Sequence, residues 1–280
     1  MLESTAVVIE SQPDYLTCSA HGADAAANLH LWALLRQHEQ EQAGNRLRPF
    51  RLQGYEGIGC GAVEWGRRDA AAVLVRLAGD VAAVHLSDAL SLADRVSRVD
   101  LAVTVRFRPA DPHVGSNTYF QAEQFHTANP PSALPWRVTD ADGGSTTYVG
   151  KRGSDNMLRV YNKEAECLAA HDDEGVKRYE ACWRFELEAK GGMAQPLARA
   201  VDERSDRAAY IQAYVHGWAV AHGILPLWEP SGSQALIPGF RRRSDADTRL
   251  LHLARNVRPT VDWLLANGYG DRVRDTLGLP

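Results

Sequence analysis

The sequence has few cysteines, and none of them is closely paired. Cys18, Cys60, Cys167 and Cys182 lie far apart, and no Cys-x-x-Cys pair occurs. Zinc knuckles and disulfide frameworks need closely or regularly spaced cysteines, so this spacing argues against both. We therefore expect four reduced thiols with a structural role.

The sequence also lacks a long hydrophobic run. No uninterrupted apolar stretch approaches the roughly 18 residues of a membrane-spanning helix. The first residues, MLESTAVVIES, contain neither the basic segment nor the apolar segment of a secretory signal. We therefore expect a cytoplasmic location and no membrane partner.

An excess of positive charge is missing as well. The chain has 31 Lys and Arg against 35 Asp and Glu, which gives a formal net charge of −4. This balance argues against broad nonspecific binding to nucleic acid, which normally depends on a basic excess. Basic residues are nevertheless clustered, so a basic groove remains possible. The clusters are Arg46, Arg48 and Arg51; Arg67 and Arg68; Lys151 and Arg152; and Arg241, Arg242 and Arg243.

Apolar residues are plentiful enough for a large core, since 45% of the 280 residues are hydrophobic. Their spacing predicts an α+β fold in which an antiparallel sheet has one polar face for catalysis and helices on the other. We expect an α+β region at 1–190, made of two β-rich halves at about 1–97 and 98–190. A mainly helical C-terminal region is expected at 191–280.

The expected elements follow from apolar periodicity and turn residues. GYEGIGCGAVEW should pair with AAVLVRLAG across the turn GRRDA, and STTYVGK with NMLRVYNK across RGSD. The stretch at 109–143, rich in Pro, Asn and Asp, is expected to be irregular. Strands are expected at 15–19, 54–65, 71–79, 98–107, 145–151, 156–163 and 181–190. Helices are expected at 23–42, 80–97, 163–171, 193–201, 206–222 and 248–266.

Three of these strands alternate apolar and polar residues. In RVDLAVTVRF the residues Val99, Leu101, Val103 and Val105 should face the core, which places Asp100 on the opposite face. If the three strands share one sheet, a single face collects carboxylates, cations and a tyrosine. The polar positions are Arg98, Asp100, Thr104 and Arg106; Arg159, Tyr161 and Lys163; and Arg184, Glu186, Glu188 and Lys190.

Such a face is most often solvated and held by cross-strand ion pairs. Here Glu186 and Glu188, two residues apart, repel each other unless a positive group lies between them, and Asp100 adds a third negative charge. A divalent metal resolves this repulsion economically. Three carboxylates form a hard oxygen site suited to Mg²⁺ or Mn²⁺, and an ion beside Tyr161 suggests phosphoryl transfer with a phenolate nucleophile.

The motif TTYVGKRGSDNMLRVYNKEAE, preceded by RVDLAVTV and followed by WRFELE, resembles the replication initiation factor family of rolling-circle initiators and relaxases. GYEGIGCGAVEWGRR and LARNVRPTVDWLLANGYGDRVRDTLGL are also similar to that family. The resemblance implies an enzyme that nicks one DNA strand and stays joined to its 5′ phosphate through a tyrosine. The implied partners are single-stranded or supercoiled origin DNA and a host helicase.

The resemblance also implies a role for individual residues. Tyr161 would be the nucleophile, and Arg159 and Lys163 would contact phosphate. Asp100, Glu186 and Glu188 would hold Mg²⁺ or Mn²⁺. Further contacts to DNA are expected from Lys151, Arg152, Arg184, Arg241, Arg242 and Arg243.

Two departures from the family pattern bear on the metal. Members of the family often carry a second acid on the same strand, four residues after the first. Here the first acid is Asp100, and the second position is Thr104. No His-x-His pair occurs among the ten histidines, which separates the chain from two-histidine nucleases. Tyr119, Tyr148 and Tyr179 are expected to be structural, while loop residue His126 is a minor candidate for a general base.

Two other functions stay open on the residues alone. One is a non-catalytic module that binds single-stranded DNA, with Tyr161 stacking on a base. The other is a metal phosphodiesterase that uses water and leaves no protein on the DNA. A covalent adduct and a metal requirement distinguish the three hypotheses.

Overall fold

The structure is a computed structural model that describes residues 5–108, 136–141, 144–150, 154–222, 228–230 and 258–272. It forms two compact units, Met1–Pro238 and Gly239–Pro280. Helix α8 (Arg258–Ala266) lies in the second unit. Helices α5 and α6 pack on the sheet within the first unit, whereas the division expected at residue 190 stays a prediction from the sequence.

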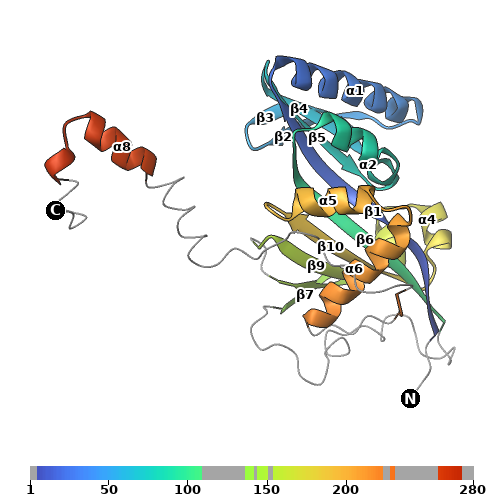
Figure 1. Cartoon of the computed structure of the whole chain (residues 1–280). Coiled ribbons are helices and arrows are strands. Elements are labelled where there is room, and N and C mark those ends of the chain that lie inside the picture. Colours follow the sequence, from blue (N-terminus) through green and yellow to red (C-terminus); the bar gives the residue numbers. More distant parts are fainter. Residues whose placement is uncertain are drawn as a thin grey trace. The chain divides into compact units, whose positions relative to one another are not determined.

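An antiparallel sheet organises the first unit (Figure 1). Its ten described strands follow the order β2-β3-β4-β5-β1-β6-β10-β9-β8-β7, so the long strands β1 and β6 pair at the centre. The strands are β1 (Thr5–His21), β2 (Leu47–Leu52), β3 (Tyr55–Cys60), β4 (Val63–Asp69), β5 (Ala72–Ala78), β6 (Arg95–Arg108), β7 (Trp136–Ala141), β8 (Gly144–Val149), β9 (Asn156–Asn162) and β10 (Cys182–Lys190).

The strand order repeats itself in the two halves of the sheet. In the first half, β1 is followed by the meander β2 to β5, whose last strand returns to pair with β1. In the second half, β6 is followed by β7 to β10, and β10 returns to pair with β6. Each polar group on the central strands therefore has neighbours from both halves.

Helices cover one face of the sheet (Figure 1). They are α1 (Ala23–Gln42), α2 (Asp80–Leu92), α5 (Ala194–Asp202) and α6 (Arg207–Ala221). Their apolar residues join Val99, Leu101, Val103 and Val105 of β6 in one buried core. Two short helices, α3 (Lys163–Ala169) and α4 (Asp173–Arg178), connect β9 to β10, and the side chain of Asn162 caps α3 by accepting a hydrogen bond from the Ala165 amide at 3.0 Å.

The structure confirms the α+β class, the antiparallel sheet and the segregation of helices to one face. The bounds of α1 and the β8–β9 hairpin also agree with the sequence pattern. None of the helices described here is both long and apolar enough to cross a bilayer.

Several elements differ from expectation. The stretch 54–65 is itself a hairpin of β3 and β4, because Gly61 adopts a positive φ of 60° that permits a tight turn. Strands β2 and β7 were not predicted, and β1 is much longer than expected. Helix α3 begins at Lys163 as expected, but β9 ends one residue earlier, at Asn162, whose side chain caps the helix. Of the helix expected at 248–266, the described part is α8.

Candidate active site

Strands β6, β10 and β9 are neighbours, so the three polar patterns do share one face of the sheet. Glu188 lies opposite Asp100 on β6, and on the other side of β10 Glu186 lies opposite Arg159 of β9. Arg184 lies opposite Tyr161. Because side chains alternate along a strand, these residues point away from the helical layer.

This polar face is buried, which corrects the expectation of an outward, solvated surface. Asp100 is 0% exposed, Glu186 2% and Glu188 4%. The reason is tertiary: these residues lie on central strands, and arginine side chains from neighbouring strands cover their carboxylates. Ion pairs on this face therefore lie in a low-dielectric environment and interact more strongly than surface pairs.

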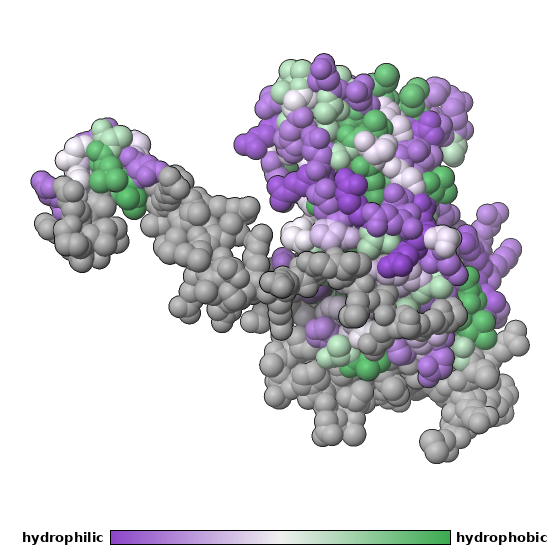
Figure 2. Space-filling view, viewed as in Figure 1, coloured by the Kyte–Doolittle hydropathy of each residue, from purple (hydrophilic) through white to green (hydrophobic). Residues whose placement is uncertain are grey.

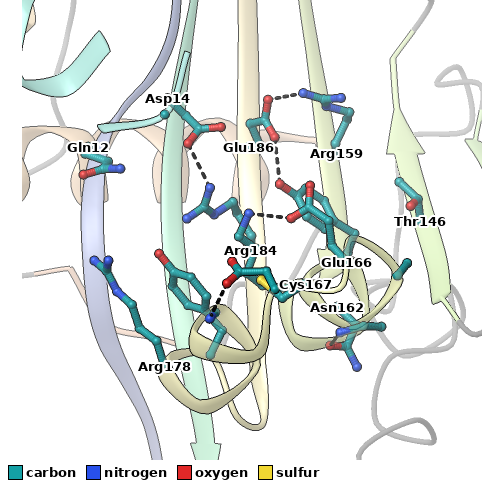
Figure 3. A pocket seen from close by; sticks show the side chains of 18 of the residues that line it. Gln12, Asp14, Thr146, Arg159, Asn162, Glu166, Cys167, Arg178, Arg184 and Glu186 are labelled. Carbon is teal, nitrogen blue, oxygen red and sulfur yellow. Dashed lines mark hydrogen bonds and ion pairs between the residues drawn. The ribbon is translucent and has the colours of Figure 1, made fainter. Parts of the chain in front are cut away.

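Tyr161 is hydrogen bonded to a carboxylate. Its phenolic Oη donates to Oε2 of Glu186 at 3.2 Å, while Arg159 binds Oε1 of the same residue (Figure 3). Burial raises the pKa of Tyr161 well above its usual value of 10, and the Glu186 charge adds to the rise, while Arg184 opposes it. The tyrosine is thus a neutral phenol with its proton directed at Glu186.

The three carboxylates have cationic partners within the protein. Arg98 donates to Oδ1 of Asp100 from Nε at 2.8 Å and reaches Oε2 of Glu188 at 2.9 Å. Arg159 binds Glu186 and lies 3.7 Å from Oδ2 of Asp100. The positive charge that the sequence pattern required between these acids is therefore supplied, at least in part, by arginine.

These cations do not fully compensate the buried acids. Burial raises the pKa of Glu186 to about 7, against the lowering effect of Arg159, and the neighbouring carboxyl of Asp100 raises it further. Burial also raises the pKa of Asp100, although its hydrogen bond to Arg98 opposes the rise. The Asp100 and Glu186 carboxyls thus influence each other's pKa.

The donor set fits a hard divalent ion in its chemistry. Carboxylates are the preferred ligands of Mg²⁺ and Mn²⁺, and the raised pKa values of Asp100 and Glu186 show that these acids would be stabilised by further positive charge. The described residues contain no ready-made group of three or more metal-binding side chains. The guanidinium groups of Arg98 and Arg159 are the cations that lie among these acids in the structure.

Arg184 is held in a clamp beside the tyrosine. Its guanidinium donates to Asp14 at 2.8 Å, to Glu10 at 2.5 Å and to Thr104 at 3.0 Å, and the residue is only 3% exposed (Figure 3). We expected Arg184 to contact DNA, but these partners already occupy its donors. The clamp joins β1, β6 and β10 and fixes the strand that bears Glu186.

A pocket of about 750 Å³ opens over this face. Its lining includes Tyr161, Arg159, Lys163 and Glu186, together with residues of α3 and α4. Nζ of Lys163 binds Glu166 at 2.5 Å and lies 5.6 Å from the centre of the Tyr179 ring. The structure therefore brings the proposed nucleophile and two candidate phosphate-binding cations to one cavity.

Other candidates have more ordinary surroundings or lie outside the described residues. Tyr179 is buried and hydrogen bonded to Glu10, and burial raises its pKa to about 12, which agrees with a structural tyrosine. Tyr148 lies opposite Arg159 on β8 and lines the pocket. Tyr119, His126, Lys151, Arg152 and Arg241 to Arg243 lie outside the described residues.

The sequence analysis missed the contribution of β1. Glu10 and Asp14 come from this strand and bind Arg184, while Gln12 and Asp14 line the pocket. A signal was present, because Glu10, Gln12 and Asp14 alternate at every second position just before the strand expected at 15–19. Arg98, noted only as a member of the polar face, is the main partner of two acids.

The fold and the site define an α+β protein with a tyrosine–carboxylate pair on the sheet face. Residues 95–217 match the family model described as "Replication initiation factor". This stretch contains Asp100, Tyr161 and Glu186, and the match confirms over it the resemblance inferred from the sequence.

The other comparisons concern whole proteins. A solved structure titled "Structure of Rolling Circle Replication Initiator Protein from Geobacillus stearothermophilus" is similar, with 14% sequence identity and a TM-score of 0.47. The match covers 86% of this chain and 91% of that chain. No curated protein matches the chain.

Proposed function

We propose that the protein is a rolling-circle replication initiator or relaxase that nicks one strand of single-stranded or supercoiled origin DNA through Tyr161. One observation carries the proposal: the Tyr161 hydroxyl is hydrogen bonded to Glu186 at 3.2 Å on the wall of a pocket that also contains Arg159 and Lys163. A nucleophile, a proton acceptor and cations for phosphate thus occupy one cavity.

The proposed reaction transfers a phosphoryl group from DNA to the tyrosine. Oη of Tyr161 forms a bond to phosphorus, and the bond from phosphorus to the 3′ oxygen breaks. The phenolic proton passes to Glu186, whose Oε2 already accepts the hydrogen bond of the phenol at 3.2 Å. The 3′ oxygen leaves with a proton taken from solvent, which yields a 3′ hydroxyl primer and a 5′-phosphotyrosine link.

Remaining roles follow the chemistry of each group. Arg159 and Lys163 would bind the phosphate oxygens. Asp100, Glu186 and Glu188 would hold Mg²⁺ or Mn²⁺, which supplies charge neutralisation at the phosphate. On the sequence pattern, Lys151, Arg152 and Arg241 to Arg243 would bind the DNA backbone, and a host helicase would extend the unwinding.

A second candidate is a metal phosphodiesterase that activates water. The raised pKa of Tyr161 favours it, because a neutral phenol is a poor nucleophile and would serve as a hydrogen-bond donor instead. The two candidates differ in their product, since water leaves no protein on the DNA. A non-catalytic module for single-stranded DNA would leave the strand intact.

The deciding experiment uses end-labelled single-stranded DNA that carries the origin of the replicon encoding this chain. Incubation with Mg²⁺ and a denaturing gel should show a shorter, protein-free strand when the DNA is labelled at its 5′ end. With a 3′ label, the fragment that begins with the 5′ phosphate at the break should be retarded by attached protein until a protease is added. Cleavage without a protein adduct would favour the phosphodiesterase. Binding without cleavage would favour the non-catalytic module.

A further inference from the structure

Arg98 lies among the acids proposed to hold the metal. From β6 it binds both oxygens of Asp100, with Nε to Oδ1 at 2.8 Å, and its Nη2 reaches Oε2 of Glu188 at 2.9 Å. One guanidinium thus bridges two carboxylates that lie opposite each other on β6 and β10. A cation shared in this way partly neutralises both carboxylates, Asp100 on β6 and Glu188 on β10.

An aromatic ring from the other half of the sheet holds this guanidinium. The central carbon of the Arg98 guanidinium lies 4.3 Å from the centre of the Tyr15 ring, which is within the range of a cation–π contact. Tyr15 itself is fixed, because its hydroxyl accepts a hydrogen bond from Arg76, which is bound to Glu64 at 3.0 Å. The guanidinium of Arg98 therefore stacks on the Tyr15 ring and also pairs with Asp100 and Glu188.

Neighbouring cations are held differently. Lys190 also binds Glu188, at 2.5 Å from its other oxygen, but its ammonium ends a flexible and partly exposed side chain. Arg159 binds Glu186 and only approaches Asp100. Arg98 alone among these three contacts two of the proposed ligands and a stacking ring.

We propose that Arg98 is a fixed counter-cation that competes with the divalent ion for Asp100 and Glu188, and that Tyr15 holds it in place. The proposal rests on the metal site of the proposed function. Two cations cannot use the same carboxylate oxygens, and a fixed positive charge a few ångströms away repels a divalent ion. Arg98 therefore stabilises the ion-free protein and lowers the affinity of the site for metal.

The test measures Mn²⁺ binding to the DNA-free protein by calorimetry. Arg98→Met keeps the apolar stem and removes the charge, so its Kd for Mn²⁺ should fall by about tenfold or more relative to wild type. Arg207→Met is the matched control, because Arg207 is also a partly buried arginine paired with an acid, Asp202 at 2.6 Å, but contacts neither Tyr15 nor the proposed ligands. Its Kd should stay within about twofold of wild type.

A second pair of variants covers the case in which Arg98→Met fails to fold. Tyr15→Leu removes the ring beneath Arg98 and should also tighten Mn²⁺ binding, by a smaller factor. Tyr15→Phe keeps the ring and loses only its hydrogen bond to Arg76, so its Kd should stay closer to wild type than that of Tyr15→Leu. Circular dichroism of each ion-free variant reports whether it has folded.

Weaker Mn²⁺ binding in Arg98→Met or Tyr15→Leu would overturn the proposal and show that Arg98 positions the acids for the metal. Absence of Mn²⁺ binding in both wild type and the folded variants would overturn it too, since no ion would then compete. Neither result bears on the nucleophile, which is tested separately through the covalent adduct on Tyr161.

Discussion

Tyr161 and Glu186 come from adjacent strands and share a hydrogen bond, with 3.2 Å between Oη and Oε2. Each residue has an arginine neighbour: Arg159 binds the other oxygen of Glu186, and Arg184 lies opposite Tyr161 in the strand register. The pair is therefore in place before DNA binds, and substitutions that remove single functional groups can test the role of each residue.

Tyr161→Phe should abolish cleavage and keep DNA binding. The change removes one oxygen and preserves the ring, so we expect a loss of about 1 kcal/mol in the free energy of unfolding from the missing hydrogen bond. Gel electrophoresis with labelled origin DNA measures cleavage, and a filter assay measures binding. An adduct that still forms on the Phe variant would place the nucleophile at another tyrosine.

Chelation should stop nicking. EDTA removes divalent ions, so cleavage of origin DNA should disappear and should return when Mg²⁺ or Mn²⁺ is added in excess. The rate of a single turnover, followed on a denaturing gel, is the measurement. Cleavage at full rate in the chelator would remove the metal from the mechanism and leave Arg98 and Arg159 as the cations that neutralise the acids.

Glu186→Gln should lose cleavage and remain folded, with a measurable loss of stability. A substitution at an exposed position would cost little stability, but Glu186 is 2% exposed and bound to Arg159. Glutamine keeps the volume but leaves that guanidinium with less compensation, so we expect the free energy of unfolding to fall by about 1–3 kcal/mol. Denaturant titration measures the loss.

Glu166→Gln is the matched control for this change. Glu166 also lines the pocket and binds a cation, Lys163, but it is exposed. Its substitution should change stability by less than about 1 kcal/mol. Equal losses of stability in the two variants, with cleavage retained in Glu186→Gln, would make Glu186 a structural ion-pair partner.

Arg184→Met should destabilise the protein strongly. The change leaves Glu10 and Asp14 without their buried cation, and breaking such a group by removing one partner costs about 3–5 kcal/mol. Arg178→Met is the control, because Arg178 binds the same Glu10 at 2.7 Å with a side chain that is 58% exposed. Its loss should stay near 1 kcal/mol or less. Similar thermal stability in the two variants would contradict the clamp.

Replacement of Arg241, Arg242 and Arg243 together should weaken binding to unrelated DNA sequences alike. Phosphate contacts position a protein without reading bases, so the loss should not depend on sequence. With a net charge of −4, the wild type should show a shallow dependence of affinity on salt, of the order of a few phosphates neutralised. A slope typical of about ten contacts would contradict this small set of cations.

Features that depend on neighbouring residues in the chain could be predicted from the sequence. Alternation in β6, β9 and β10 is read from neighbouring residues, so Asp100, Tyr161 and Glu186 could be placed on one face without a structure. Burial of that face could not be predicted, because it depends on Arg98 and Arg159 reaching acids on other strands. Alternation indicates a face and says nothing of what covers it.

The contribution of β1 was hidden for a different reason. Register shifts interrupt its pairing with β6 between Val8 and Glu10 and again between Pro13 and Tyr15. Glu10, Gln12 and Asp14 still alternate in the sequence, but Pro13 among them reads as a strand breaker. Glu10 and Asp14 therefore looked like loop residues although they complete the Arg184 clamp.

The central pair β1 and β6 joins the two halves of the sheet into one structural unit. The family match begins at residue 95, at the start of β6, whereas Glu10, Asp14 and Tyr15 come from the strand before it. A fragment trimmed to the matched stretch would expose the full hydrogen-bonding edge of a long apolar strand and lack one wall of its own pocket. The protein therefore cannot be divided at the point where sequence similarity alone would place a module boundary.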